Sequence, residues 1–144
     1  SFKTDAEAGD PRYTSKVVER ADTTTYDGLK SNLAVSVWSG AYDPIAVVRN
    51  EELVLLKAEA NIGKGGDGLT EINAVRSAHG LSAVSTGGID QLLHEKRYSL
   101  FMEGHRWVDM RRYSKTGSLP NDRSDRGDKV FDSFPLPEAE TKGL

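Results

Sequence analysis

Residues 89–113 read IDQLLHEKRYSLFMEGHRWVDMRRY, which is the most ordered pattern in the chain. The apolar positions of the first half fall on one face of a helix, at Ile89, Leu92, Leu93, Leu100 and Phe101. Thr86 is a candidate cap for this helix, which we expect to end at about Met102. Gly104 predicts a bend, and a short helix should then continue through Tyr113.

The preceding residues predict two further helices joined by a glycine-rich turn. The first covers about 50–61, with Asn50 as its N-cap. It carries two apolar stripes that predict packing on two sides, namely Leu53, Leu56 and Ala60, and Leu55, Ala58 and Ile62. The second covers about 67–78, and Gly80 suits a left-handed position after it. Two such helices around a short turn predict an antiparallel hairpin that resembles one tetratricopeptide unit.

The two ends of the chain are polar and rich in turn signals. Residues 1–25 are expected to be extended or irregular, and 33–38 to form a short strand. Residues 114–133 resemble a long exposed loop, whereas 134–137 are expected to dock as an extended segment because two prolines fix the backbone. The sequence therefore predicts a mainly α fold of tetratricopeptide-like helical hairpins, with long irregular segments and at most short strands. We expect a single domain over 1–144, with an irregular segment at 1–48, a helical core at 49–113 and a loop and docked tail at 114–144.

Four segments, in order, resemble motifs of the SusD/RagB family. Residues 45–60 resemble its Pro-Ile-x-x-x-Arg-x-x-Glu helix, 72–76 its Ile-Asn-x-Val-Arg helix, 89–113 its Glu-Gly-x-Arg-x-x-Asp-Leu-Arg-Arg segment, and 134–137 its closing Phe-Pro-Ile-Pro. There are departures from the pattern. Lys96 stands where the family usually has the Glu of a Glu-Arg pair, with Glu95 one place earlier, and Ser99 stands where a second Glu is common.

This resemblance implies a surface lipoprotein of Bacteroidetes-type bacteria that captures nutrients beside an outer-membrane transporter. Such a protein holds an oligosaccharide or similar nutrient and closes as a lid over a TonB-dependent SusC-type transporter. The matched motifs imply the C-terminal portion of a longer protein, with membrane association only through a lipid anchor outside this chain. The implied localisation is the bacterial outer membrane, and the implied function involves no bond chemistry.

Composition excludes several classes of site. The chain of 144 residues has no cysteine, so disulfides, thiolate chemistry and cysteine-based zinc sites are excluded. Its formal net charge of −3 is small and argues against a protein that binds polyanions as a whole. No apolar run approaches the roughly 20 residues of a membrane span.

The charged cluster after Phe101 allows two interpretations. Glu103, Arg106, Asp109 and Arg112 have the spacing of a partly buried structural ion-pair network, and with Arg111 the same residues would suit a catalytic acid and base with an arginine clamp. We favour the structural network, because nothing in the sequence indicates a cleft. Residues 94–115 hold six Lys or Arg against three acids, a local excess of +3. The acids interrupt this basic run, so we expect an ion-paired helix face and no nucleic-acid partner.

Other candidate sites have simpler alternatives. His79, His94 and His105 are not spaced as zinc ligands on a helix. The aspartates that surround Gly127 offer oxygen ligands for calcium, but a polar loop is the simpler interpretation of Asp122, Asp125, Asp128 and Asp132. The glycines at 63–68 follow a helix, whereas a phosphate-binding loop follows a strand. We therefore expect no metal and no cofactor.

Aromatic residues supply the candidate ligand contacts. Trp38 and Tyr42, with Tyr26 before them, lie in segments expected to be irregular, where binding residues are often found. Flat aromatic faces stack on sugar rings, although packing inside the protein is the alternative for Trp38. Trp107 lies within the family motif and is expected to pack in the core.

Three functions from different classes follow. The preferred one is non-enzymatic nutrient binding, with an oligosaccharide as the expected ligand. The alternative is a helical protein–protein interaction module without glycan binding, which would show an apolar groove and no aromatic platform. A carboxylate-based hydrolase ranks third, because it needs Glu103 or Asp109 accessible in a pocket.

Overall fold

The computed structural model describes residues 2–26, 28–120, 127, 129–131 and 133. The chain divides into two compact units, Ser1–Arg106 and Trp107–Leu144. The first unit contains most of the secondary structure and the buried core. The second contains most of α5 (His105–Arg112) and a short 3-10 helix, η1 (Thr116–Ser118).

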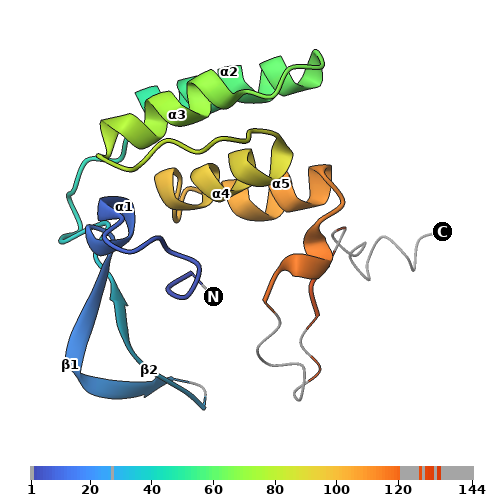
Figure 1. The fold of residues 1–144 in the computed structure, drawn as a ribbon. Coiled ribbons are helices and arrows are strands. Elements are labelled where there is room, and N and C mark those ends of the chain that lie inside the picture. The colour runs from blue at the N-terminus through green and yellow to red at the C-terminus, as the bar shows by residue number, and fades with distance from the viewer. Residues whose placement is uncertain (1, 27, 121–126, 128, 132, 134–144) are drawn as a thin grey trace. The chain divides into compact units, whose positions relative to one another are not determined.

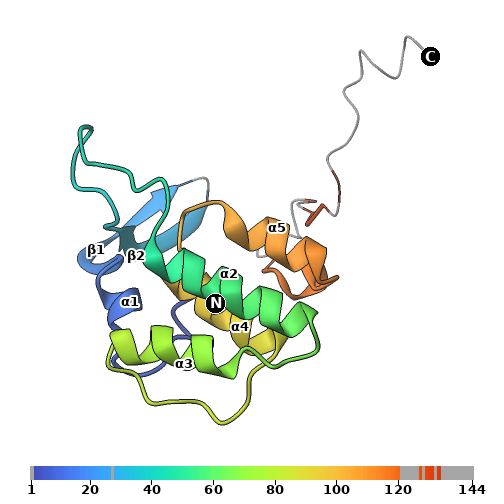
Figure 2. The ribbon, with the colours of Figure 1, turned by 90° about the horizontal axis from the view of Figure 1, so that it is seen from above.

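The core of the first unit lies between α2 (Asn50–Gly63), α3 (Leu69–Ala78) and α4 (Ile89–Ser99). Both views show α2 and α3 side by side, with α4 packed against them (Figures 1 and 2). Their shared core is almost completely buried and consists of Leu55, Ala58, Ile72, Val75 and Leu92. Each fully buried leucine or isoleucine contributes about 1.5 to 3 kcal/mol to folding. The predicted helix-rich fold is therefore confirmed.

The helix boundaries agree with the sequence prediction to within a few residues. Helix α2 begins at Asn50, but the N-cap position belongs to Arg49, one residue earlier than expected. Helix α4 begins after Gly88 rather than at a cap on Thr86. Gly80 has a φ of 70° and Gly104 a φ of 82°, so both predicted left-handed or bent positions are found. Such values are ordinary only for glycine.

One face of α2 is exposed, which corrects the expectation that this helix packs on two sides. Leu55 and Ala58 are fully buried, whereas Leu53 and Leu56 are 52% and 55% exposed. The core formed with α3 and α4 covers only the second predicted stripe, that of Leu55, Ala58 and Ile62. Leu53 and Leu56 thus present an apolar surface on the outer side of the helix.

A two-stranded antiparallel sheet occupies part of the segment that was expected to be irregular. Strand β1 (Val17–Tyr26) pairs with β2 (Leu29–Val35), and a short helix α1 (Pro11–Thr14) precedes them. The pairing shifts register between Glu19 and Thr24, as at a β-bulge. Figure 1 shows this ribbon extending away from the helices of the first unit. The strand predicted at 33–38 overlaps β2, and β1 lies largely in a segment predicted to be extended or irregular. Because most of β1 is exposed, its sequence carries no alternating apolar pattern, and the pairing of the two strands was not predicted.

The second unit is described by itself. The Trp107 indole donates a hydrogen bond to the Phe131 carbonyl at 2.8 Å, and the Arg111 guanidinium lies 5.5 Å from the centre of the Trp107 ring. Residues 134–137, expected to dock as an extended segment, lie outside the described residues. No helix within the described part of the chain is both long and apolar enough to cross a membrane.

Gly68 provides a test of the close approach between α2 and α3. A Cβ there would lie 3.0 Å from the Ala58 carbonyl oxygen and 3.1 Å from Ile62 Cδ1, whereas a Cβ at Gly80 meets nothing within 4 Å. Both glycines have a positive φ, so the backbone strain is matched. We predict that Gly68→Ala lowers the free energy of unfolding by about 2 to 3 kcal/mol and Gly80→Ala by about 1 kcal/mol. Equal losses in chemical denaturation would contradict this packing.

Candidate functional site

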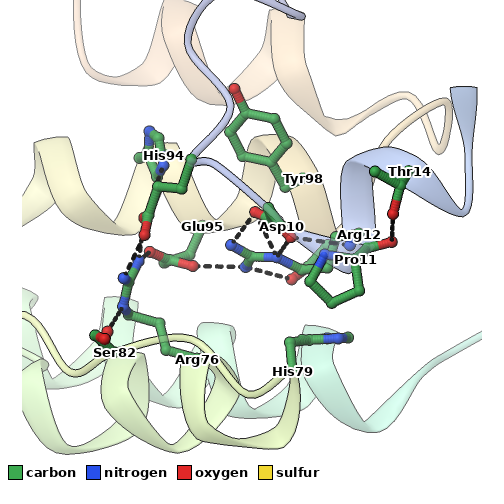
Figure 3. A network of polar contacts seen from close by, with 12 residues as sticks. Asp10, Pro11, Arg12, Thr14, Arg76, His79, Ser82, His94, Glu95 and Tyr98 are labelled. Carbon is green, nitrogen blue, oxygen red and sulfur yellow. Dashed lines mark hydrogen bonds and ion pairs between the residues drawn. The ribbon is translucent and has the colours of Figure 1, made fainter.

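A carboxylate with no exposure to solvent lies at the centre of the first unit. Glu95 on α4 is 0% exposed. Its Oε2 accepts a hydrogen bond from Arg12 Nη1 at 2.5 Å, and its Oε1 accepts one from Arg76 Nη1 at 2.8 Å. Gln91, one turn earlier on α4, donates to the same Oε1 at 2.7 Å. Figure 3 shows Glu95 between the two guanidinium groups, which come from α1 and α3.

Arg12 is fixed by its own short helix. Asp10 caps α1, since its Oδ1 accepts from the Arg12 amide at 2.9 Å, and Pro11 occupies the first helical turn. The same carboxylate also binds the Arg12 side chain, at 2.8 Å from Nη2 to Oδ2. Burial alone would raise the pKa of Asp10, but the hydrogen bonds from Arg12 lower it below its usual value. The helix cap and the ion pair, both made by Asp10, therefore hold the Arg12 side chain in the same position.

Arg76 joins α3 to the N-terminal segment. Its guanidinium makes a two-pronged contact with Glu7, at 2.6 Å and 2.8 Å, and its Nε donates to the Ser82 carbonyl at 2.7 Å. The hydrogen bonds from Arg76 lower the pKa of Glu7 below its usual value. Three acids thus meet two arginines in one network, and the buried network connects residues up to 83 positions apart.

The end of α4 is held by two further cations. Lys16 Nζ donates to the Tyr98 and Ser99 carbonyls at 2.6 Å and 2.8 Å, and Arg49 Nη2 donates to the Ser99 carbonyl at 2.5 Å. The last carbonyls of a helix lack partners within the helix and carry a partial negative charge. Burial, reinforced by the positive charge of Arg49, lowers the pKa of the Lys16 amine to about 8. Hydrogen bonds from Lys16 and Arg49 thus satisfy the last carbonyls of α4, although burial disfavours the charge of Lys16.

Three groups that commonly bind metals also meet in this region. Glu7, His94 and Glu95 each offer a ligand atom, and these atoms lie within 4.8 Å of one another. Glu7 and Glu95 already receive hydrogen bonds from Arg76, and Glu95 another from Arg12. Two guanidinium charges at the same oxygens disfavour a metal cation. We therefore assign these carboxylates to ion pairing.

The charged residues singled out from the sequence lie as follows. Glu103 pairs with Arg49, which belongs to another of the family-like segments, and Arg106 donates to the Leu93 carbonyl at 3.2 Å. Asp109 is 4% exposed and Arg112 is exposed. An accessible catalytic carboxylate at Asp109 is thus incompatible with its burial. The calcium candidates Asp122, Asp125, Asp128 and Asp132 lie outside the described residues.

The candidate ligand-binding aromatics lie away from the buried network. Trp38 is 40% exposed and Tyr42 is 100% exposed, in a segment between β2 and α2 that has no helix or strand of its own. Tyr26 ends β1 opposite Leu29, and the direction of its side chain is not described. Trp38 and Tyr42 are therefore accessible to a ligand as the sequence analysis required.

Sequence reasoning missed the partners Asp10 and Arg12. Asp10-Pro11-Arg12 carries the signature of a helix start, a capping acid followed by proline, but residues 1–25 were expected to be extended or irregular. Arg76 stands in the second family-like segment, and its partners Glu7 and Glu95 lie 69 and 19 positions away. A single sequence carries no signal for such a pairing.

Comparisons with known proteins agree with the resemblance seen in the sequence. The model of the family described as the SusD family matches residues 22–142. A relative named SusD-like protein P38, from Formosa agariphila, is 33% identical over 86 residues. That alignment covers 49% of this chain and only 17% of the relative, so the chain spans a small part of that protein's length. No solved structure matches the chain.

Arg12 provides a direct test of the buried network. Arg12→Met removes the charge that compensates Glu95 and Asp10, both almost without exposure. We predict a loss of about 3 to 5 kcal/mol in the free energy of unfolding, because an uncompensated carboxylate stays buried. The control Arg20→Met, at an exposed position on β1, should change it by less than about 0.5 kcal/mol. Similar values for the two variants would contradict a structural role for Arg12.

Lys16 provides a test by pH. We predict that its amine titrates near pH 8, against an ordinary value of 10.5, when followed by NMR of the side-chain Cε. The unfolded chain then holds this proton at higher pH than the folded chain does. Between pH 8 and 10.5 the Lys16 contribution to stability should therefore rise with pH, and the rise should be absent in Lys16→Met. A titration at the ordinary value would show that the amine is not buried as described.

Proposed function

The chain belongs to the SusD family, and we propose from this membership that it takes part in non-enzymatic binding of an oligosaccharide or similar nutrient at the bacterial cell surface. Family membership supports the general function of nutrient binding. The residues that contact the ligand are a proposal from the geometry of this chain. One observation carries the proposal. The acids and arginines of the network around Glu95 are largely buried, whereas Trp38 and Tyr42 are exposed to solvent.

The charged residues of the family-like segments are engaged in structural contacts. Arg49 and Glu103 pair with one another, while Arg76 binds Glu95 and Glu7. A general acid or base must reach a substrate proton, but Glu95 is 0% exposed and Asp109 is 4% exposed. These residues therefore support a scaffold that holds a ligand without changing its bonds.

The exposed aromatics have the properties of a sugar-binding surface. Trp38 and Tyr42 present flat faces to solvent, and Ser39 and Asp43 lie beside them in the chain. Aromatic rings stack on the apolar face of a sugar ring, while neighbouring polar groups bind its hydroxyls. We propose that Trp38 and Tyr42 contact the ligand, with Tyr26 as a third contact.

The whole protein is proposed to act with a TonB-dependent SusC-type transporter at the outer membrane. This part of the proposal rests on family membership alone. It includes attachment to the membrane as a surface lipoprotein. A cofactor is not required for capture and delivery of a nutrient.

One observation favours the alternative of a protein–protein interaction module. Leu53 and Leu56 lie exposed on the outer side of α2, and Val47 before them is 94% exposed. Contiguous apolar surface of this kind often marks a contact with another protein segment. This surface and the aromatic turn are separate sets of residues, so variants can distinguish the two functions.

A binding experiment on the full-length protein tests the proposal. We predict that at least one of maltohexaose, cellohexaose, xylohexaose and mannohexaose binds in calorimetry. Trp38→Ala should weaken this binding at least about fivefold, since stacking on one aromatic ring contributes on the order of 1 kcal/mol or more. The control Leu56→Ala removes an apolar side chain of α2 that is somewhat more exposed than Trp38 and should leave the affinity unchanged.

Three outcomes would contradict the proposal. Unchanged affinity in Trp38→Ala would remove this residue from the site, and loss of transporter capture in Leu56→Ala without any glycan binding would favour the interaction module. Release of reducing ends by the protein, abolished in Glu103→Gln, would contradict the non-enzymatic function.

A further inference from the structure

The turn that separates Trp38 from Tyr42 is closed by a single side chain. Asp43 Oδ2 accepts hydrogen bonds from the Ser39 amide, from the Gly40 amide at 3.0 Å and from the Ser39 hydroxyl at 3.0 Å. The Asp43 amide in turn donates to the Gly40 carbonyl at 3.3 Å. One carboxylate oxygen therefore gathers three donors from the two residues that follow Trp38.

Packing against other side chains does not fix the position of Tyr42. Tyr42 is 100% exposed, so no neighbouring side chain restricts its ring. Residues 36–49 contain no helix or strand that would fix their backbone. The hydrogen bonds of Asp43 are thus the contacts that restrict the backbone between the two aromatic residues.

We propose that Asp43 is a positioning residue for ligand binding, whose carboxylate holds the Ser39–Asp43 turn in the conformation that presents Trp38 and Tyr42 to one sugar chain. This inference rests on the proposed function. A loop that is ordered before binding loses less conformational entropy when the ligand arrives, and this raises affinity without any contact from the ordering residue itself. Asp43 therefore affects binding by fixing the positions of Trp38 and Tyr42, without contacting the ligand itself.

The charge state of Asp43 suits this role. Hydrogen bonds from the Ser39 and Gly40 amides, together with the Ser39 hydroxyl, lower the pKa of the Asp43 carboxyl below its ordinary value of 3.8. Because the folded-state pKa is lowered, the contribution of the carboxylate is present above the ordinary value and is lost as the pH falls through the lowered one. The turn is therefore closed throughout the neutral and mildly acidic range.

The experiment compares Asp43→Ala with Asp43→Asn in the full-length protein, using the hexaose that the wild type binds most tightly. We expect Asp43→Ala to weaken binding about threefold to tenfold, which corresponds to the ordering of one or two side chains. Asp43→Asn keeps one carbonyl acceptor and should retain most of the affinity. Asp22→Ala, at an exposed aspartate of β1, is the matched control and should bind as the wild type does.

A second measurement separates positioning from general stability. Hydrogen exchange at the Ser39 and Gly40 amides, followed by mass spectrometry, should accelerate in Asp43→Ala and stay near the wild-type rate in Asp43→Asn. The thermal midpoint should be the same in all variants, because Asp43 makes these contacts within its own turn and is not part of the buried core.

Each outcome has a definite meaning. Weaker binding in Trp38→Ala and Asp43→Ala, with recovery in Asp43→Asn, supports the inference. Weaker binding in Trp38→Ala alone overturns the role of Asp43 and leaves the proposed function intact. Unchanged binding in Trp38→Ala, or no binding of any hexaose, overturns the proposed function and this inference with it. A lowered thermal midpoint in Asp43→Ala shows a structural role and overturns positioning.

Discussion

The burial of Glu95 is the constraint on which the rest of the first unit depends. A carboxylate with no exposure is stable only if cations and hydrogen-bond donors replace the water it has lost. Arg76 comes from the neighbouring helix α3, and Arg12 comes from a segment 83 residues earlier in the chain. The N-terminal residues must therefore pass beside α4 for the helical core to form. The same contacts leave Glu95 unable to take part in chemistry.

The charged residues and the exposed aromatic residues of this chain make different kinds of contact. Charged residues of the family-like segments join helices to one another, as Arg49 does when it binds both the end of α4 and Glu103. Aromatic residues on the segment between β2 and α2 are free to contact a ligand. Such a division explains how a rigid helical frame, dense in acids and arginines, serves a proposed function that needs no acid or base catalyst.

Local patterns were enough to predict the helices but not the contacts between distant segments. Apolar periodicity located α2, α3 and α4, while Gly80 marked the end of α3 and Gly104 the bend before α5. These signals lie within a few residues of the structure that they determine. A strand was predicted where β2 ends, but β1 was not recognised as its partner, since β1 is largely exposed and shows no alternation. Glu95 was noticed only as a departure from a motif. Its role depends on Arg12, and no local pattern connects residues so far apart.

A double-mutant cycle between Arg12 and Glu95 tests the central claim most directly. The free energy of unfolding is measured for Arg12→Met, Glu95→Leu and the double variant, all under the same conditions. If the two side chains stabilise one buried pair, the double variant is more stable than the sum of the single losses implies, with a coupling energy of at least about 1 kcal/mol. Losses that add to within about 0.5 kcal/mol would show that Arg12 and Glu95 act independently, and would contradict the account.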